Sequence, residues 1–172
     1  LGLLIQEKGP TVLVEAMKRI PDVPLKIAGR GYLDGALREQ IEKAGLKNVE
    51  LVGFVTGDRL EELVHNSRFV VMPSIWYENY PMTILDAYSW GKPVVGSDLG
   101  GIPEMITPGE HGMLANHSDP DDLAAKMKAV WDDPDLAVEM GRKARARIEA
   151  ELSPEVYIEK VLAVYRTLLD RR

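Results

Sequence analysis

Residues 74–101 read SIWYENYPMTILDAYSWGKPVVGSDLGG and hold, in order, an aromatic loop, a helical stretch and a short strand. Pro81 suits the first position of a helix, because the N–H that proline lacks would have no partner there. We therefore expect a helix over Pro81–Trp90. Val94–Gly96 follows as a fully apolar run of strand length, and Gly100–Gly101 marks a turn. A helix that leads into an apolar strand indicates a parallel sheet covered on both faces.

The same alternation runs through the rest of the chain. The other expected strands are Leu1–Ile5, Leu25–Ala28, Val49–Val52, Phe69–Met72 and Met113–Ala115. The other expected helices are Pro10–Arg19, Leu33–Lys43, Asp58–His65, Pro120–Trp131, Pro134–Ala150 and Pro154–Asp170. Right-handed crossovers then build a doubly wound, Rossmann-like α/β fold of about six parallel strands with a helical C-terminus. Ligands of such folds bind at the carboxyl ends of the strands.

Composition narrows the class of function. The 172 residues are the size of one domain, and 45% of them are hydrophobic, which suffices for a core. The formal charge of −6 argues against nucleic-acid binding, so an anionic ligand must be held by local features. The chain has no cysteine, which excludes disulfides and fits a reducing compartment. No apolar run reaches the ~20 residues of a membrane span. The chain opens in a predicted strand without an initiator Met, so we expect part of a larger protein.

Two acidic strings resemble a metal–diphosphate motif. The sequence DPD occurs at Asp119–Asp121 and again at Asp133–Asp135. In each string the first Asp precedes a Pro that opens a helical stretch, which is the pattern of an N-cap followed by Pro at the first helical position. The histidines His65, His111 and His117 lack ligand spacing and are expected on the surface. We predict capping at both strings, no metal and no cofactor.

Two loops at strand ends could contact a nucleotide. Gly29–Gly31 follows a strand and resembles the start of a dinucleotide fingerprint, but Asp34 stands where the third glycine belongs. This segment is either a tight β–α turn or a backbone surface that a nucleotide can approach. Lys8 follows the first strand, where a lysine can meet a phosphate as a point charge. A lysine in a loop can equally be solvated.

The start of the helix predicted at Pro81 suits an anion. The free N–H groups of Met82 and Thr83, together with the positive end of the helix dipole, form a site for a diphosphate. Asp86 lies about 7.5 Å further along the axis and could accept hydrogen bonds from two vicinal hydroxyls. Glu78 would face a group on the other side. Alternatively, Glu78 is a first-turn acid favoured by the dipole, and Asp86 is an exposed helix residue.

Together these stretches resemble the C-terminal, donor-binding domain of a family 4 retaining glycosyltransferase with the GT-B fold. The motifs occur in the family's order: EKG at 7–9, IAGRG at 27–31, VELVGFV at 49–55, PSIWYENYPMTILDA at 73–87, GKPVVGSDLGGIPE at 91–104 and HGML at 111–114. The closing segment 153–169 resembles the family's terminal helix. The match covers nearly the whole chain and is most specific from Pro73 to Glu104.

The resemblance implies a role for each matching residue. Lys8 contacts the donor diphosphate, Glu78 faces the hydroxyls of the transferred sugar, and these two residues are catalytic. Asp86 holds the ribose hydroxyls. The diphosphate and sugar are further cradled by Asn79, Tyr80, Pro81, Met82 and Thr83. The nucleobase is bordered by Gly29, Arg30, Gly31, Phe54 and Val55.

The resemblance also implies an activity. We expect a hexosyltransferase that moves a sugar from a nucleotide diphosphate, UDP- or GDP-linked, to an acceptor hydroxyl with retention and without a metal. Residues 1–172 form a single donor-binding domain in this view, and the N-terminal acceptor domain is absent, so the isolated chain should be inactive. The expected location is the cytoplasm, with membrane contact only through the missing domain or a lipid acceptor.

Three departures from the family's pattern keep a second interpretation open. Asp86 stands where the family has a longer glutamate, and Leu3 stands where it usually has an arginine. Tyr80–Pro81 replaces a Phe-Gly pair, which removes one backbone donor and gives more weight to Met82 and Thr83. The alternative function is therefore a non-catalytic nucleotide-sugar-binding or sensor domain.

Overall fold

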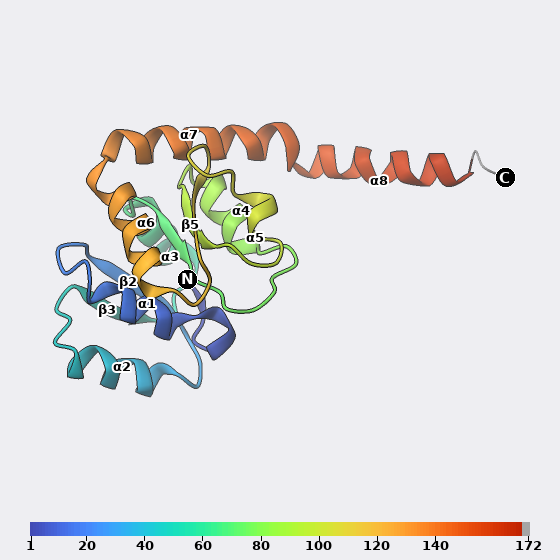
Figure 1. Cartoon of the computed structure of the whole chain (residues 1–172). Helices are drawn as coiled ribbons and strands as arrows, with labels where there is room; N and C mark the ends of the chain where they lie inside the picture. Colours follow the sequence, from blue (N-terminus) through green and yellow to red (C-terminus); the bar gives the residue numbers. More distant parts are fainter. Residues whose placement is uncertain (170–172) are drawn as a thin grey trace.

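The computed structural model describes residues 1–169, in which strands alternate with helices along the chain (Figure 1). The strands are β1 (Gly2–Leu3), β2 (Leu25–Arg30), β3 (Val49–Gly53), β4 (Val70–Met72), β5 (Val94–Ser97) and β6 (Gly112–Ala115). The helices are η1 (Gln6–Lys8), α1 (Pro10–Met17), α2 (Asp34–Lys43), α3 (Gly57–His65), α4 (Met82–Ser89), α5 (Ile102–Met105), α6 (Pro120–Asp132), α7 (Pro134–Glu151) and α8 (Pro154–Leu169). The predicted α/β class with a helical C-terminus is confirmed.

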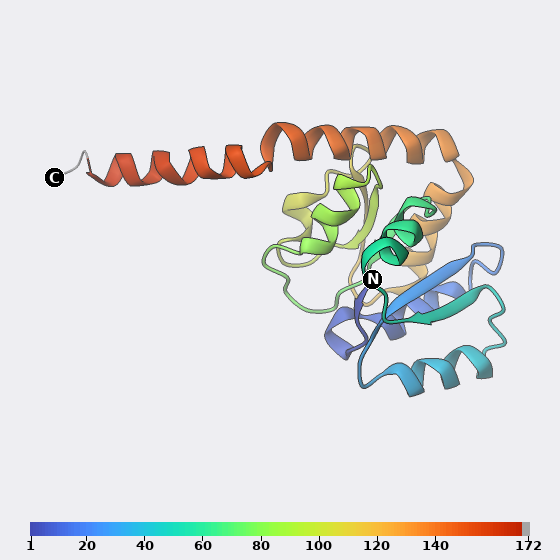
Figure 2. The same ribbon diagram turned by 180° about the vertical axis from the view of Figure 1, so that it is seen from behind.

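The strands form two sheets of three strands each. One has the order β1-β2-β3 and the other β4-β5-β6, and all pairs are parallel. The expected sheet of about six strands is thus divided between β1 and β4. Since β1 is only two residues long, it pairs with β2 at Gly2–Gly29 and Leu3–Arg30 alone. Helices surround the two sheets, as the front and back views show (Figures 1 and 2).

Several boundaries differ from the sequence prediction. The first strand ends at Leu3 rather than Ile5, because Gln6–Lys8 turns into the short helix η1. The helix predicted from Pro81 begins at Met82. Helix α5 was missed, since four residues are too few for a helical period to be visible. The end predicted for the last helix, at Asp170, lies outside the described residues.

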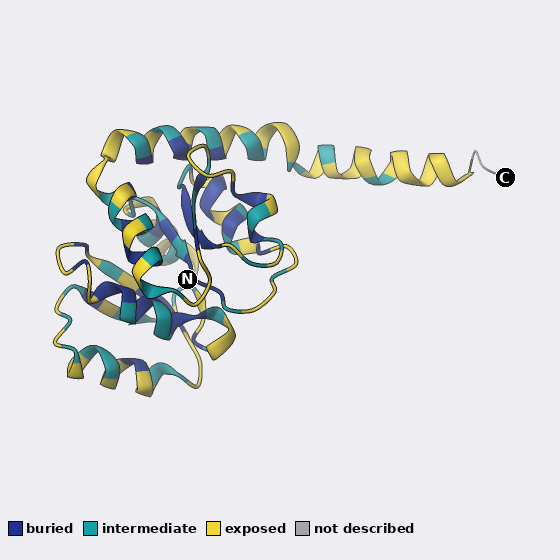
Figure 3. Ribbon diagram, viewed as in Figure 1, coloured by how far each residue is buried: buried dark blue, intermediate teal, exposed yellow. Residues whose placement is uncertain are grey.

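The core lies on both faces of the strands. Val94 and Val95 are neighbours in β5 and fully buried, yet they belong to different hydrophobic clusters. Side chains of a strand alternate between its faces, so an apolar run of this kind needs cover on both sides. One cluster includes residues of α1 and α6, and the other includes residues of α4, α5 and α7. Figure 3 shows β5 as a buried strand between them.

Helix α8 extends away from the rest of the molecule. It follows α7 and has no buried residue, and Figures 1 and 3 show it as an exposed arm. Apolar side chains such as Tyr157, Leu162 and Tyr165 are exposed on it. Among residues 1–169, no helix combines the length and the hydropathy required to cross a bilayer.

The two acidic strings cap helices, as predicted. The carboxylate of Asp119 accepts hydrogen bonds from the N–H groups of Asp121 and Asp122, at 2.9 and 3.1 Å. The carboxylate of Asp133 accepts one from the N–H of Leu136 at 2.9 Å. Each carboxylate therefore satisfies N–H groups that the first turn of a helix leaves without an internal partner.

Candidate functional site

The loop after β4 is locked to the loop after β1. The N–H of Ile75 donates a hydrogen bond to the C=O of Glu7 at 2.9 Å. Gly9 has a φ of +64°, and a Cβ at this position would lie 1.9 Å from the carbonyl oxygen of Pro73. Only glycine fits such a left-handed position against another backbone. This contact brings Lys8, which precedes Gly9, beside the segment that leads into α4.

A glycine pair holds the other side of the same loop. The N–H of Gly101 donates to the C=O of Glu78 at 2.6 Å. A Cβ on Gly101 would lie 2.1 Å from the carbonyl oxygen of Asn79, and Gly100 has a φ of +61°. The turn after β5 therefore packs directly on the backbone of the loop. Backbone contacts from two separate strand ends fix the position of Glu78.

Three polar side chains meet inside this frame. The ammonium of Lys8 lies 2.5 Å from Oε1 of Glu78, and the hydroxyl of Ser74 donates to the same oxygen at 2.7 Å. The Glu78 side chain is 15% exposed and Lys8 is 38% exposed, whereas Ser74 is buried. The structure thus brings together the lysine and the first acid that the sequence singled out.

The environment keeps Glu78 ionised. Burial by itself would raise the pKa of its carboxyl, because a charged group loses hydration. The hydrogen bonds from Lys8 and Ser74, with the charge of Lys8, outweigh burial and hold the pKa below its ordinary value. The site therefore presents a carboxylate at neutral pH, with a cation against it.

The start of α4 lies beside this cluster, with one correction to the prediction. Pro81 is the N-cap, not the first helical residue, because its ψ of 110° is extended. Its C=O accepts a hydrogen bond from Ile84 at 3.0 Å. The N–H groups of Met82 and Thr83 have no acceptor within residues 1–169. Thr83 also lines a small cavity of about 80 Å³ together with Lys8.

The remaining residues of the predicted site lie on the surface around this point. Asn79, Tyr80 and Met82 are exposed. Asp86 is exposed on α4, and its carboxylate has no ion pair or hydrogen bond within the described part of the chain. It is thus open to a ligand, as either interpretation of the sequence requires.

The loop after β2 has a structural reason for its glycines. A Cβ on Gly29 would lie 1.7 Å from the carbonyl oxygen of Gly2, and one on Gly31 would lie 2.2 Å from that of Leu4. These glycines therefore allow close pairing with β1, which is the tight-turn interpretation. The guanidinium of Arg30 lies 4.6 Å above the ring of Phe54, so the structure brings these two predicted residues together.

One predicted residue lies elsewhere, and two contributors were missed. Val55 lines a larger cavity between the two sheets. Ser74 was not predicted, although it precedes Glu78 by four residues, because no periodicity marks a buried serine in a loop. Tyr32 was also missed. Its hydroxyl accepts a hydrogen bond from the N–H of Gln6 at 2.9 Å and ties the loop after β2 to η1.

The histidines are separate from this site. His65 and His117 are exposed, as predicted, but His111 is half-buried, with its ring 6.0 Å from that of Tyr88. Burial, followed by the charge of Arg147, lowers the pKa of His111. Within residues 1–169, no group of three His, Asp or Glu residues is arranged to hold a metal ion.

The fold and this arrangement define a class of protein. Parallel strands with helices on both sides, and a lysine, an acid and a helix start gathered at their carboxyl ends, are those of the C-terminal domain of a GT-B protein. The chain belongs to the family described as glycosyl transferases group 1, which matches residues 1–147.

Similar proteins fit this assignment. The D-inositol 3-phosphate glycosyltransferase of Paenarthrobacter aurescens is 34% identical over 158 residues, which cover 87% of this chain and 38% of that protein. The glycogen synthase of Mycobacterium tuberculosis is 31% identical over 170 residues, covering 96% of this chain and 41% of the enzyme. HepE of Anabaena, solved in complex with UDP, superposes with a TM-score of 0.86 at 22% identity, covering 96% of this chain and 48% of that chain. The chain thus spans less than half the length of these proteins.

Proposed function

We propose that this chain is the donor-binding half of a family 4 glycosyltransferase. The complete enzyme would transfer a hexose from a UDP- or GDP-linked donor to an acceptor hydroxyl, with retention and without a metal. The observation that carries the proposal is the Lys8–Glu78 pair beside the open start of α4. Membership of the glycosyl transferases group 1 family supports it, as does the fold shared with the UDP complex of HepE.

The diphosphate would bind where positive charge is already fixed. Lys8 offers a full charge, and the N–H groups of Met82 and Thr83 stand at the positive end of the α4 dipole. During transfer the bond between the anomeric carbon and the diphosphate oxygen breaks, and its electrons remain on the diphosphate. The acceptor oxygen bonds to the anomeric carbon and loses its proton. Groups that are fixed in advance stabilise the growing negative charge most effectively.

Glu78 would bind the sugar. Its carboxylate accepts hydrogen bonds from Lys8 and Ser74 in the ligand-free chain. A bound diphosphate would compete for Lys8, and Glu78 would then accept hydrogen bonds from sugar hydroxyls while Ser74 still orients it. Asp86, which is exposed further along α4, would accept hydrogen bonds from the ribose. The Arg30–Phe54 stack would border the nucleobase.

Calorimetric titration tests the proposal. UDP, GDP, ADP and their sugars are titrated into the parent chain and into Lys8→Ala. Loss of a charge-assisted contact should weaken binding of the preferred diphosphate about 10- to 100-fold. Lys43→Ala is the matched control, since Lys43 also pairs with a glutamate, Glu39, but lies on α2. Equal affinity of Lys8→Ala and the parent chain would remove Lys8 from the site.

The ribose assignment and the catalytic role are tested separately. Asp86→Ala should weaken UDP binding more than it weakens binding of 2′-deoxy-UDP, and equal losses would remove Asp86 from the ribose contact. The isolated chain should bind donor without glycosylating an acceptor. A full-length protein that binds nucleotide sugars but neither hydrolyses nor transfers them would favour the sensor function suggested by Asp86 and Leu3.

A further inference from the structure

The division between the two sheets leaves two strand edges facing each other without a partner. In a parallel sheet, successive residues direct their backbone groups alternately to the two neighbouring strands. The N–H of Leu4 bonds to the C=O of Arg30, so Lys26, at the other end of β2, directs its backbone groups to the same side. On β4, the N–H of Val70 bonds to Pro93 of the other neighbour, so Val71 faces the gap. Proteins rarely leave such edges open.

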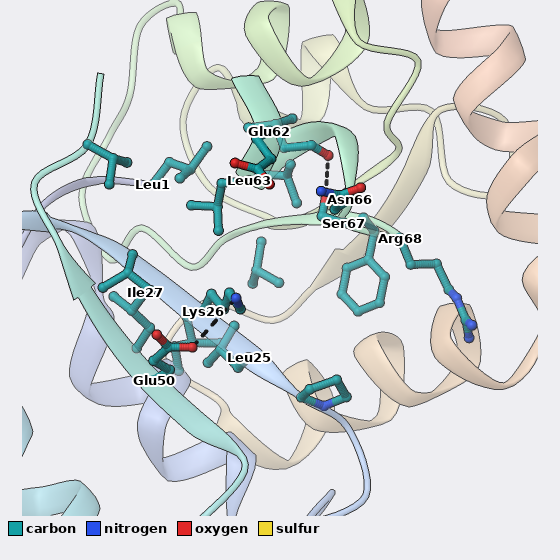
Figure 4. Close-up of a pocket in the computed structure, with 18 of the residues that line it drawn as sticks. Leu1, Leu25, Lys26, Ile27, Glu50, Glu62, Leu63, Asn66, Ser67 and Arg68 are labelled. Carbon is teal, nitrogen blue, oxygen red and sulfur yellow. Dashed lines mark hydrogen bonds and ion pairs between the residues drawn. The ribbon is translucent and has the colours of Figure 1, made fainter. Parts of the chain in front are cut away.

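A cavity of about 410 Å³ lies between these edges (Figure 4). Leu25 and Ile27 of β2 form part of one wall, Leu63 of α3 and Val71 of β4 form part of the other, and Leu1 lies at one end. Protein interiors are close-packed, with few voids larger than a water molecule, which takes up about 30 Å³ in the liquid. This cavity is an order of magnitude larger and mainly lined by apolar side chains near the centre of the fold.

The register of β1 shows what would fill it. Gly2 lies opposite Gly29 and Leu3 opposite Arg30, an offset of 27 residues. With the same offset, Leu1 lies opposite Ala28. Three further residues ahead of Leu1 would run opposite Ile27, Lys26 and Leu25, which is the start of β2.

We propose that the cavity is the seat of a short apolar strand, the segment that immediately precedes Leu1 in the longer protein. It would lie parallel between β2 and β4 and continue directly into β1. The first and third residues before Leu1 would bond to β2, satisfying the backbone groups of Lys26, and the second would bond to β4 beside Val71. Because both faces of the segment are covered, all three side chains are apolar.

This strand would join the two sheets into one. The resulting order, β3-β2-β1-β4-β5-β6, is the doubly wound order expected for this class of fold. The length of the similar proteins agrees with such an extension, since the chain spans less than half of each. The inference does not depend on donor binding, because the cavity lies between the sheets and the lysine–glutamate pair lies outside it.

The test adds three residues to the N-terminus of the chain. A Val-Ile-Val extension is compared with Gly-Ser-Gly, which has the same length but no large apolar side chain. A second control, Val-Pro-Val, lacks the N–H that should bond to β4. The Val-Ile-Val extension should raise Tm by about 10 °C over Gly-Ser-Gly, from three buried apolar side chains. Val-Pro-Val should give less than half of that rise.

Hydrogen exchange locates the effect. With Val-Ile-Val, the amides of Lys26 and Val71 should exchange at least about tenfold more slowly, while Val95, inside its sheet, should not change. Equal Tm and exchange in the Val-Ile-Val and Gly-Ser-Gly chains would overturn the proposal. Slow exchange of Lys26 and Val71 already in the unextended chain would also overturn it. So would a dimer of the unextended chain that protects both edges, since a second copy would then be the occupant.

A substitution inside the cavity gives an independent check should the extended chains fold poorly. Val71→Phe adds a ring to the wall that faces the gap. It should raise the Tm of the unextended chain by a few degrees, because it fills empty volume, and abolish the gain from Val-Ile-Val, because both need the same space. Additive gains from the two changes would show that the segment binds elsewhere.

Discussion

Replacing Gly9 by alanine should destabilise the protein and weaken nucleotide binding together. The new Cβ would lie 1.9 Å from the carbonyl oxygen of Pro73, whereas ordinary contacts begin at 3.4 Å, so the overlap is 1.5 Å (3.4 − 1.9). Both sides of this contact are backbone, and no rotamer change relieves it. The φ of +64° adds about 1 kcal/mol for a residue with a Cβ.

The loop after β4 must then move away from the loop after β1. That movement breaks the hydrogen bond from Ile75 to Glu7, which contributes about 1 kcal/mol. With the strain at φ and the displaced packing, Gly9→Ala should lower the free energy of unfolding by about 3 kcal/mol. It also separates Lys8 from Glu78, so UDP should bind about tenfold more weakly. Urea unfolding measures the first quantity and calorimetry the second.

Gly35→Ala is the matched control. Gly35 lies within α2, and a Cβ there would meet no atom within 4 Å. Because alanine favours a helix over glycine, this change should stabilise the protein by about 0.5–1 kcal/mol and leave UDP binding unchanged. The reasoning is refuted if Gly9→Ala unfolds within about 1 kcal/mol of the parent chain, which is the range of an ordinary substitution.

Three further predictions follow from the contacts described. Glu78→Gln removes the carboxylate that competes for the neighbouring lysine, so UDP should bind about fivefold tighter, a gain of about 1 kcal/mol in a calorimetric titration; weaker binding would contradict this. Tyr88→Phe removes a buried hydroxyl that donates to the C=O of Met105 at 3.0 Å, and should lower the free energy of unfolding by about 1 kcal/mol in urea; an unchanged midpoint would contradict it. His111 has a lowered pKa in the folded state, so the unfolded chain takes up the proton first; stability should be complete above about pH 6.5 and fall as the pH drops below it, and the parent chain should lose more than His111→Gln between pH 7 and pH 5. Parallel pH profiles for the parent and His111→Gln would refute the last.

Much of the fold could be predicted because local pattern and global packing agree. Runs such as Val94–Val95 are apolar on both faces, which only a covered parallel strand explains. The capping residues Asp119 and Asp133 mark their helices in the same way. The break between the sheets was not predictable, because it depends on how far β1 extends beside β2 and β4, a property of strand pairing over long distances.

The site was predicted as residues but not as contacts. Lys8 and Glu78 are separated by 70 positions, and their pairing depends on backbone contacts at Gly9 and Gly101. Those glycines are visible in the sequence, but what their missing side chains make room for is not. The start of α4 was misplaced by one residue because a proline suits both the N-cap and the first helical position, and only the ψ of Pro81 distinguishes them. The roles of the individual residues in binding a donor remain predictions.

The exposed arm formed by α8 has a consequence for how the chain behaves in water. A helix of 16 residues is about 24 Å long, and without burial it is near the length at which helices in solution only just form. Tertiary packing therefore adds almost nothing to its stability, and it should interchange with coil on a submicrosecond to microsecond scale. Limited proteolysis should cut here first, and a chain ending at Ser153 should melt at the same temperature as the intact one.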